Sequence, residues 1–308
     1  MPTPQPAIFA EMGQHQWYVH LRRENGADLE HIKSVIADTR AAADAAGVNL
    51  VVGFGPGLLA ELTADVPDDF QDFVTIESTD GSGREAKGTQ EELLFWLNSP
   101  DKDQVWQTQY DARTALAGHM VVPRDTNTFI LGDSLDMTGF IDGTGNPEPE
   151  REPEVALVPD GSPGAGGSFI LAQRWVHDLD AWNQMSVEEQ EKVFGRTKPD
   201  SERLDPQEDF SHLSHVELRD GATADATKPK RNEIARRSTP YAFHGAVSVV
   251  GLYFMAFCRE QAPFRERLRA MYGLDGAGVR DRLTDFSNPA SGSFYFAPSV
   301  EALDAMLA

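Results

Sequence analysis

Residues 139–147 read Gly-Phe-Ile-Asp-Gly-Thr-Gly-Asn-Pro and place one carboxylate, Asp142, inside a glycine-rich and apolar turn. Glycine permits tight turns and close approach of the backbone to a ligand. An acid held in such a setting is a candidate for proton transfer on a bound substrate. An Asp that only caps a loop, by hydrogen-bonding its own backbone, gives the same pattern. The turn alone therefore leaves both interpretations of Asp142 open, and segments further along the chain decide between them.

Several downstream segments agree with one known family. They are Val176–Asn183, Gly195–Glu202, Ser211–Leu218, Arg236–Tyr241 and Ser291–Pro298. Together with the Gly-x-x-Asp-Gly turn, they resemble the dye-decolorising peroxidases, in particular the bacterial cytoplasmic P/B-type haem enzymes of that family. The resemblance covers most of residues 45–308 in the expected order. One such motif is a weak signal, whereas several in order are a strong one.

The resemblance implies an α+β fold made of two ferredoxin-like domains, each an antiparallel sheet with flanking helices, as in the dimeric α+β barrel-like superfamily. Residues 1–150 would form the first domain, and residues 151–308 the second, which holds the haem. The local patterns agree, because strand-like and helix-like stretches alternate. No strong internal sequence repeat marks the duplication.

Periodicity and turn residues predict individual elements. Helices are expected over 28–46, 110–118, 187–193 and 262–272, the last with its Arg and Glu side chains facing outward. Strands are expected over 19–22, 48–55, 89–98, 169–177 and 246–256. The Pro- and Gly-rich stretch 158–167 indicates a hairpin or a linker. Residues 219–232 are polar and resemble a surface insertion.

The resemblance implies one b-type haem per chain, with His212 as the axial ligand of its iron. His215 is the rival, because it lies three residues on and would share a helix face with His212. The other ring nitrogen of the ligand should donate to a carboxylate, which Asp281 or Asp285 could supply. Asp281 is preferred.

On the opposite face of the haem, the resemblance assigns proton transfer to Asp142, charge stabilisation to Arg236 and a hydrogen bond to Ser238. Arg suits this task because it stays protonated at any working pH. Arg237 is the adjacent alternative cation. Further cofactor contacts are expected from two groups, the turn residues and the apolar wall: Gly143, Thr144, Asn146, Leu252, Phe254 and Phe296.

Composition limits the partners and the location of the chain. The 308 residues carry a formal net charge of −22, so nucleic acid and anionic membranes are poor partners. The single cysteine, Cys258, excludes an intramolecular disulfide and thiolate metal clusters. No secretory signal and no apolar run long enough to span a membrane is recognisable. We therefore expect a cytoplasmic protein.

The expected activity is that of a haem peroxidase, which reduces hydrogen peroxide and oxidises dyes or phenolic and other organic reductants by one-electron steps through a ferryl intermediate. A homo-oligomer, a dimer or larger, is also expected. The alternative is a haem-binding protein that stores or delivers haem or releases its iron. An acidic ferredoxin-like module without haem is a third interpretation, which leaves His212, Asp142 and Arg236 without a joint purpose.

Overall fold

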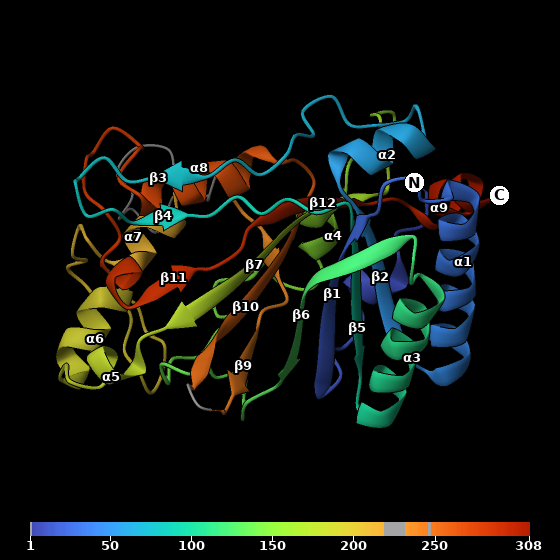
Figure 1. Cartoon of the computed structure of the whole chain (residues 1–308). Coiled ribbons are helices and arrows are strands. Elements are labelled where there is room, and N and C mark those ends of the chain that lie inside the picture. Colours follow the sequence, from blue (N-terminus) through green and yellow to red (C-terminus); the bar gives the residue numbers. More distant parts are fainter. Residues whose placement is uncertain (1, 219–231, 246–247) are drawn as a thin grey trace.

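One large antiparallel sheet forms the framework of the chain (Figure 1). The computed structural model describes residues 2–218, 232–245 and 248–308. The insertion predicted at 219–232 lies outside the described residues except for Asn232. None of the helices in these ranges combines the length and the apolar character needed to cross a membrane.

Ten strands make up this sheet, and two short strands pair separately as a hairpin. The order in the main sheet is β6-β1-β5-β2-β12-β7-β10-β8, with β11 also pairing with β7 and β9 with β10. The main-sheet strands are β1 (His15–Arg23), β2 (Asn49–Phe54), β5 (Leu93–Ser99), β6 (Met120–Phe129), β7 (Ser168–His177), β8 (Ala235–Arg236), β9 (Thr239–Phe243), β10 (Val249–Cys258), β11 (Ser287–Pro289) and β12 (Ser293–Ala297). The hairpin strands are β3 (Ile76–Glu77) and β4 (Glu85–Ala86).

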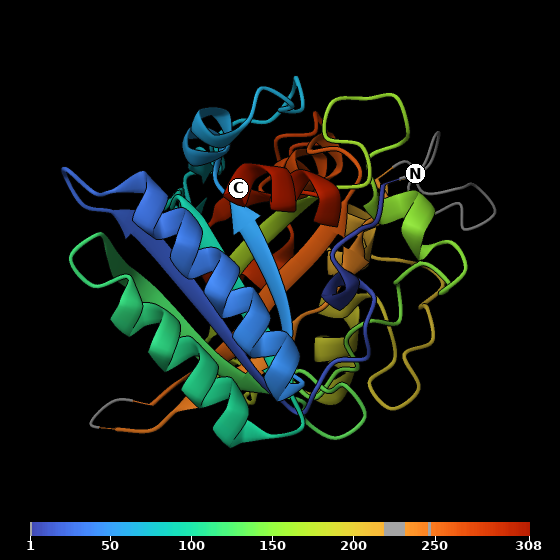
Figure 2. The ribbon, with the colours of Figure 1, turned by 90° about the vertical axis from the view of Figure 1, so that its right-hand side faces the viewer.

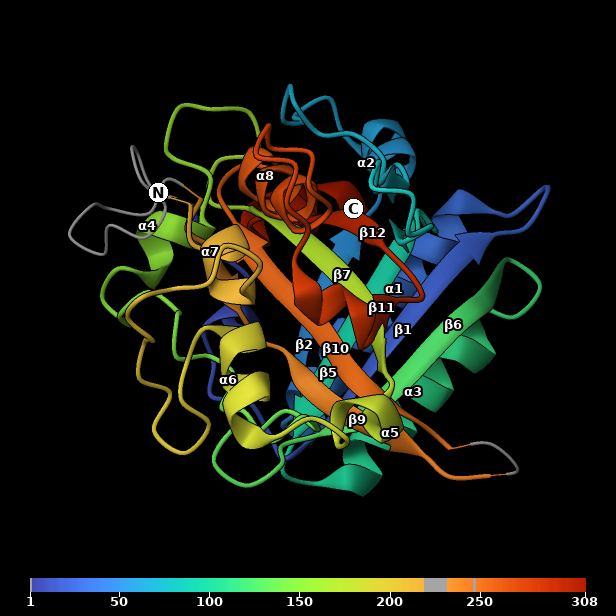
Figure 3. The same cartoon turned by 90° about the vertical axis from the view of Figure 1, so that its left-hand side faces the viewer.

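The helices lie mainly outside the sheet. Figure 2 shows α1 and α3 side by side over the strands of the N-terminal half, and Figure 3 shows α6, α7 and α8 on the side of β7 and β10. The α-helices are α1 (Leu29–Ala46), α2 (Pro56–Leu62), α3 (Lys102–Ala115), α4 (Glu152–Ala156), α5 (Leu179–Trp182), α6 (Val187–Phe194), α7 (His212–Val216), α8 (Ala262–Met271) and α9 (Val300–Leu307). The described residues also form two 3₁₀ turns, Pro6–Ile8 and Arg282–Asp285.

The strand order repeats in the two halves, which the sequence did not reveal. In the N-terminal half the strands β1, β2, β5 and β6 lie in the order β6-β1-β5-β2. In the C-terminal half the strands β7, β9, β10 and β12 lie in the equivalent order β12-β7-β10-β9. Numbered along the chain, both are fourth-first-third-second, the ferredoxin-like order. The expected fold class is therefore confirmed.

The two halves join into a nearly closed barrel. At one junction β12 pairs with β2 through Phe296 and Phe54. At the other, the side chains of Thr128 on β6 and Thr239 on β9 meet, with 2.7 Å between their hydroxyl oxygens. The side chains along each strand alternate between the barrel interior and the outer helices.

This alternation divides the core into two main apolar clusters. On β1, Val19 and Leu21 belong to the cluster that packs against the outer helices, whereas Tyr18 belongs to the cluster inside the barrel. Cys258 is buried at the end of β10, and burial raises the pKa of its thiol to about 11. The prediction that Cys258 is a buried hydrophobe is confirmed.

The long elements follow their sequence signals. Helix α1 begins after Asp28, whose side chain accepts hydrogen bonds from the backbone of residues 30 and 31, and ends at Gly47, whose φ is +65°. Helix α8, predicted over 262–272, begins and ends close to its predicted bounds. The predicted loop 158–167 closes on itself through two backbone hydrogen bonds between Val158 and the pair Gly166 and Gly167, both 2.9 Å.

Several predicted boundaries were wrong. Strand β1 begins at His15 rather than at Val19, and β5 begins at Leu93 rather than at Thr89. Helix α3 begins at Lys102 rather than at Tyr110, because Asp101 caps its start and the first two turns are polar. Strand β10 begins at Val249 and extends to Cys258, two residues beyond the predicted end, and the predicted start at 246–247 lies outside the described residues.

We predict that Gly251→Ala destabilises the protein. A Cβ at this position in β10 would lie 1.9 Å from the carbonyl oxygen of Trp175 on β7. Overpacking of this kind costs about 1–3 kcal/mol, so thermal unfolding monitored by circular dichroism should occur at a lower temperature. Gly57→Ala in α2 is the control, because its Cβ would meet no atom within 4 Å. Equal unfolding temperatures for the two variants would contradict the prediction.

Candidate active site

The main cavity lies between the outer face of β7 and β10 and the helices α6, α7 and α8. The space between its walls is about 880 Å³, part of which is open to solvent. Apolar side chains form most of its wall: Phe140, Ile141, Leu171, Phe194, Val216, Ile234, Leu252, Phe254, Phe264, Leu268, Met271 and Leu283. Leu252 and Phe254, which the sequence analysis expects in an apolar wall, are among these residues.

His212 stands on one wall of this cavity. It is the first residue of α7, whose start is fixed by the side chain of Ser211. Its Nδ1 lies 2.7 Å from Oδ2 of Asp281, a fully buried carboxylate whose other oxygen accepts a hydrogen bond from the backbone of Leu283. Within the described part of the chain, Nε2 of His212 has no hydrogen-bond partner. The ring is thus oriented by one nitrogen and has the other free for a ligand in the cavity.

His215, the rival, has a different environment. Its Nδ1 lies 2.8 Å from the carbonyl oxygen of Ser211, and its Nε2 lies 3.1 Å from that of Val279. It is buried and is not among the residues that line the cavity. The geometry therefore favours His212 over His215 as a ligand.

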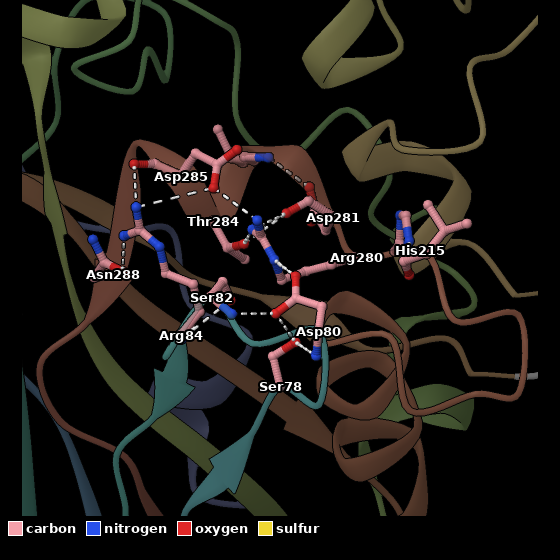
Figure 4. Close-up of polar contacts among 12 residues, drawn as sticks. Ser78, Asp80, Ser82, Arg84, His215, Arg280, Asp281, Thr284, Asp285 and Asn288 are labelled. Atoms are coloured by element: carbon pink, nitrogen blue, oxygen red, sulfur yellow. Dashed lines mark hydrogen bonds and ion pairs between the residues drawn. The ribbon is translucent and has the colours of Figure 1, made fainter.

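Asp285, the alternative carboxylate partner, is engaged elsewhere (Figure 4). Its Oδ1 accepts a hydrogen bond of 2.8 Å from Arg280. Arg280 also donates to Asp80 in the loop between β3 and β4, at 2.8 Å, and contacts the hydroxyl of Thr284. Hydrogen bonds, from Ser82 first and then from Arg280, hold the pKa of Asp80 below its usual range. A loop of the N-terminal half thus holds the turn that carries Asp281.

Asp142 and Arg236 stand together on another wall, with 3.6 Å between Oδ1 of Asp142 and Nη2 of Arg236. Both side chains are about four-fifths buried. The backbone N–H of Gly143, whose φ is +92°, donates to the same Oδ1 at 2.7 Å. Asp142 itself is fixed through its backbone N–H, which donates to the carbonyl of Ser134. No described residue donates a hydrogen bond to Oδ2, so this oxygen can accept a proton.

Asn146 orients Arg236 rather than lining the main cavity. Its Oδ1 accepts from the backbone N–H of Arg236 at 3.0 Å, and its Nδ2 donates to the carbonyl of Arg236 at 3.1 Å. Arg237, the alternative cation, turns away and forms an ion pair with Glu152 at 2.6 Å. Arg236 is therefore the cation that faces Asp142.

The remaining expected site residues differ in whether they line a cavity next to Asp142. Ser238 lies beside Asp142 in a side cavity, and its buried Oγ has no hydrogen-bond partner among the described residues. Gly143 lines a further side cavity that also reaches Asp142. Thr144 accepts a hydrogen bond from Ser201 and lines none of these cavities.

Phe296 does not reach the cavity, which corrects the expectation that it forms part of the wall. It pairs with Phe169 near the start of β7, whereas the cavity begins at Leu171. Its ring packs edge-on against Phe169, with 5.2 Å between the ring centroids. The ring is therefore part of the core between the sheet and the outer elements.

A buried histidine–carboxylate pair in the cavity was missed by the sequence analysis. Nε2 of His177 lies 3.0 Å from Oδ1 of Asp136, and Nδ1 lies 2.8 Å from the hydroxyl of Ser287. Burial alone would raise the pKa of Asp136, but His177 and the hydrogen bonds from Thr138 outweigh burial and lower it. The two residues are 41 positions apart, so no local spacing could have joined them.

Arg267 was also missed, because the Arg side chains of α8 were expected to face outward. It is 9% exposed, lines the cavity and donates to the backbone carbonyl of Asn232. Burial, and then the charge of Arg236, lowers the pKa of Arg267. Two buried nitrogens on the opposite wall, Nε2 of Gln173 and Nε1 of Trp175, have no partner among the described residues.

These observations fit haem. The apolar walls suit the faces of a porphyrin, and the unpartnered donors with the cation Arg267 suit its carboxylates. His212 supplies a neutral nitrogen for iron. An oriented histidine and an acid–arginine pair in one cavity thus define a site of the haem-peroxidase class.

Comparisons with known proteins place the chain within that class. Residues 133–302, more than half of the chain, match the family model described as Dyp-type peroxidase, C-terminal. A dye-decolorizing peroxidase of Mycolicibacterium paratuberculosis is 32% identical over 240 residues, which are 77% of this chain and 65% of that protein. One from Mycobacterium tuberculosis is 30% identical over 259 residues, 83% of this chain and 75% of that protein. The chain therefore spans just under two thirds of the first relative and three quarters of the second.

Solved structures agree over nearly the whole length. The dye-decolorizing protein from V. cholerae has a TM-score of 0.87 and 31% identity, and the match covers 97% of this chain and 98% of that one. DyPB from Rhodococcus jostii has a TM-score of 0.87 and 27% identity, covering 98% and 97%. A variant of that protein has been solved in complex with heme. The chain belongs to the dye-decolorising peroxidase family, a family of haem peroxidases.

We predict that His212 carries its proton on Nδ1, because Asp281 accepts a hydrogen bond there. Nitrogen-15 NMR of ligand-free protein above about pH 8, where an ordinary imidazole is neutral, should show this tautomer. Asp281→Ala should shift the ring toward the Nε2–H tautomer. Asp285→Ala is the matched control and should leave the tautomer unchanged. A shift in the Asp285 variant alone would assign the supporting role to Asp285 instead.

Proposed function

We propose that this protein is a haem-dependent peroxidase that reduces hydrogen peroxide with electrons from an organic reductant, such as a dye or a phenol. The observation that carries the proposal is a single cavity that contains both His212, backed by Asp281, and the pair Asp142 and Arg236. Either pair alone would fit many functions. Both pairs facing one space fit the activation of a small molecule on a bound metal.

In this proposal His212 is the ligand of one b-type haem per chain, and Leu252 and Phe254 contact the porphyrin. The bound haem supplies the iron chemistry that passes electrons from the reductant to the peroxide. The charge of Asp281 keeps Nδ1 of His212 protonated and strengthens electron donation by the ring. Arg267, Gln173 and Trp175 offer the donors that the haem carboxylates need.

Asp142 is the proposed proton carrier for peroxide. Its Oδ2 is free to take a proton from one peroxide oxygen and return it to the other. Gly143 and Arg236 hold Oδ1 and fix the orientation of the carboxylate. Arg236, oriented by Asn146, stabilises the negative charge that develops as the O–O bond breaks. Ser238 offers a hydroxyl without a partner as a further hydrogen-bonding group beside Asp142.

The alternative function, storage or delivery of haem, accounts for less of the site. It would use His212 and the apolar wall in the same way. It gives no role to an acid with a free oxygen beside an oriented arginine, because holding haem requires no proton transfer. Release of iron from haem is distinguished by its product, since the visible spectrum of the haem would disappear without turnover of a reductant.

We also propose the finer features that the resemblance implies. The chain divides near residue 150 into an N-terminal unit, residues 1–150, and a haem-binding unit, residues 151–308. The repeated strand order supports this division, although Asp136 and Asp142 bring part of the site from before the boundary. The absence of binding to nucleic acid and to anionic membranes agrees with the net charge of −22. The cytoplasmic location and the homo-oligomeric state are proposed on the resemblance alone.

We predict that His212→Ala strongly reduces retention of haem. The iron would lose its protein ligand while the apolar wall stays intact, so the fold should persist. The measurement is the haem absorption per protein after gel filtration, with circular dichroism as the check on folding. His215→Ala is the matched control and should retain haem. Retention by the His212 variant with an unchanged spectrum, together with loss by the His215 variant, would reverse the assignment.

We predict that Arg236 contributes to peroxide cleavage at least as much as Asp142. A water molecule can partly replace a carboxylate as a proton carrier, but Arg237 is held by Glu152 and cannot replace the cation. In stopped-flow mixing with peroxide, the first change of the haem spectrum should slow by roughly 10²–10³-fold in Arg236→Leu. Asp142→Ala should slow it by the same factor or less.

Arg237→Leu is the control for the loss of a neighbouring arginine and should react like the unmutated protein. If Arg236→Leu reacts as fast as the unmutated protein while Asp142→Ala is slow, the ranking of the two residues is wrong. If neither variant slows, the proton-transfer role of the pair fails.

A further inference from the structure

A histidine is enclosed between two tyrosines inside the barrel, away from the haem cavity. Nε2 of His20 on β1 lies 2.5 Å from the hydroxyl oxygen of Tyr253 on β10. Nδ1 of His20 lies 2.6 Å from the hydroxyl oxygen of Tyr295 on β12. All three side chains are at most 2% exposed. The peroxidase mechanism described above uses none of them.

The protonation of this group can be read from its surroundings. Burial, followed by the charge of Arg124, lowers the pKa of His20 to about 3, so the ring is neutral near pH 7. A neutral imidazole has one N–H donor and one lone pair. One tyrosine must therefore donate to His20, and the other must accept from it.

The tautomer of His20 sets which tyrosine donates. With the proton on Nδ1, His20 donates to Tyr295, and its Nε2 carries the lone pair and accepts from Tyr253. The hydroxyl of Tyr253 has no other hydrogen-bond partner among the described residues. In this tautomer the three groups form a chain directed from Tyr253 through His20 to Tyr295.

Tyr253 lies on β10, a strand that lines the proposed haem cavity. Its neighbours in sequence, Leu252 and Phe254, both line the cavity. Because side chains alternate along a strand, Tyr253 points to the opposite face, into the barrel. There its ring stacks on that of Tyr18, with 3.6 Å between the centroids. Tyr253 thus lies next to the cavity wall, while its hydroxyl is hydrogen-bonded to His20, a base that is buried away from solvent.

We propose that Tyr253 is a redox-active residue that gives one electron to the peroxide-oxidised haem and its hydroxyl proton to Nε2 of His20. The O–H bond of Tyr253 breaks and an N–H bond forms on His20, which leaves a neutral tyrosyl radical beside an imidazolium. The haem is reduced by one electron. When a reductant supplies an electron to Tyr253, the proton returns from His20. This inference rests on the proposed function, which supplies the oxidant.

The base explains why this tyrosine and not another would be oxidised. A buried tyrosine that loses an electron without losing its proton becomes a buried cation, which is costly in an apolar interior. Its hydroxyl is then far more acidic than an imidazolium, so transfer to His20 remains downhill even though burial disfavours the charged ring. Arg124, which faces His20, is itself paired with Glu91 at 3.1 Å, which reduces its repulsion of the imidazolium.

Tyr241 is a matched control within the same half of the fold. It is also fully buried, and its hydroxyl donates at 2.8 Å to the carbonyl of Trp175, which lines the cavity. A backbone carbonyl accepts a hydrogen bond but does not take up the proton. Tyr241 therefore has the burial and the position of Tyr253 without its base.

The test is electron paramagnetic resonance of haem-loaded protein frozen shortly after mixing with peroxide, without a reductant. The unmutated protein and Tyr241→Phe should give a tyrosyl radical, identified by its narrowing when ring-deuterated tyrosine is incorporated. Tyr253→Phe should reduce its yield at least tenfold. An unchanged radical in Tyr253→Phe, or loss of the radical in Tyr241→Phe alone, would overturn the proposal.

A second measurement needs no variant. In the unmutated protein labelled with nitrogen-15 histidine, the radical should show a coupling to an exchangeable proton and to a histidine nitrogen. A tyrosyl radical without these couplings would contradict transfer to His20. A haem spectrum that changes with peroxide while no tyrosyl radical forms overturns this inference alone. A haem spectrum that does not respond to peroxide overturns the proposed function, and this inference with it.

Discussion

The antiparallel pairing of β7 with β10 is the constraint on which the rest of the structure depends. Its register places Trp175 opposite Leu252 and Gln173 opposite Phe254, and all four side chains face the cavity. The intervening residue Tyr253 faces the barrel interior. A slip of one residue would exchange the two faces of a strand. One strand pair therefore fixes both the wall of the proposed haem site and the buried tyrosine–histidine chain behind it.

The polar groups of the site are held by contacts between segments rather than by the elements that carry them. Helix α7 has five residues and β8 has two, which are too short to be stable by themselves. Ser211 and Asp281 hold His212, Asn146 holds Arg236, and the Ser134 carbonyl with the Gly143 amide holds Asp142. Preorganisation of this kind lets the groups act without rearranging at the moment of reaction.

The sequence was sufficient for the long elements, and it named three residues that the structure brings around one cavity. Helices α1 and α8 and strand β7 carry strong periodic or apolar signals, and the motif residues His212, Asp142 and Arg236 do lie around one cavity. The start of α3 was missed because its first turns are polar. The His177–Asp136 pair and the inward position of Arg267 depend on tertiary packing, which no local pattern records. Phe296 is the opposite case, because the resemblance placed this motif residue at the haem and the structure places it in the core.

The loop between β3 and β4 bears on how far the two halves can be treated as modules. Asp80 of that loop pairs with Arg280, which holds the turn that presents Asp281 to His212. The repeated strand order suggests that each half could be exchanged for that of a relative. An exchanged N-terminal half would keep this contact only if it carried a carboxylate in the place of Asp80, and it would also have to offer a strand that pairs with β12 as β2 does. The symmetry of the architecture thus conceals a dependence of the C-terminal half on the N-terminal one.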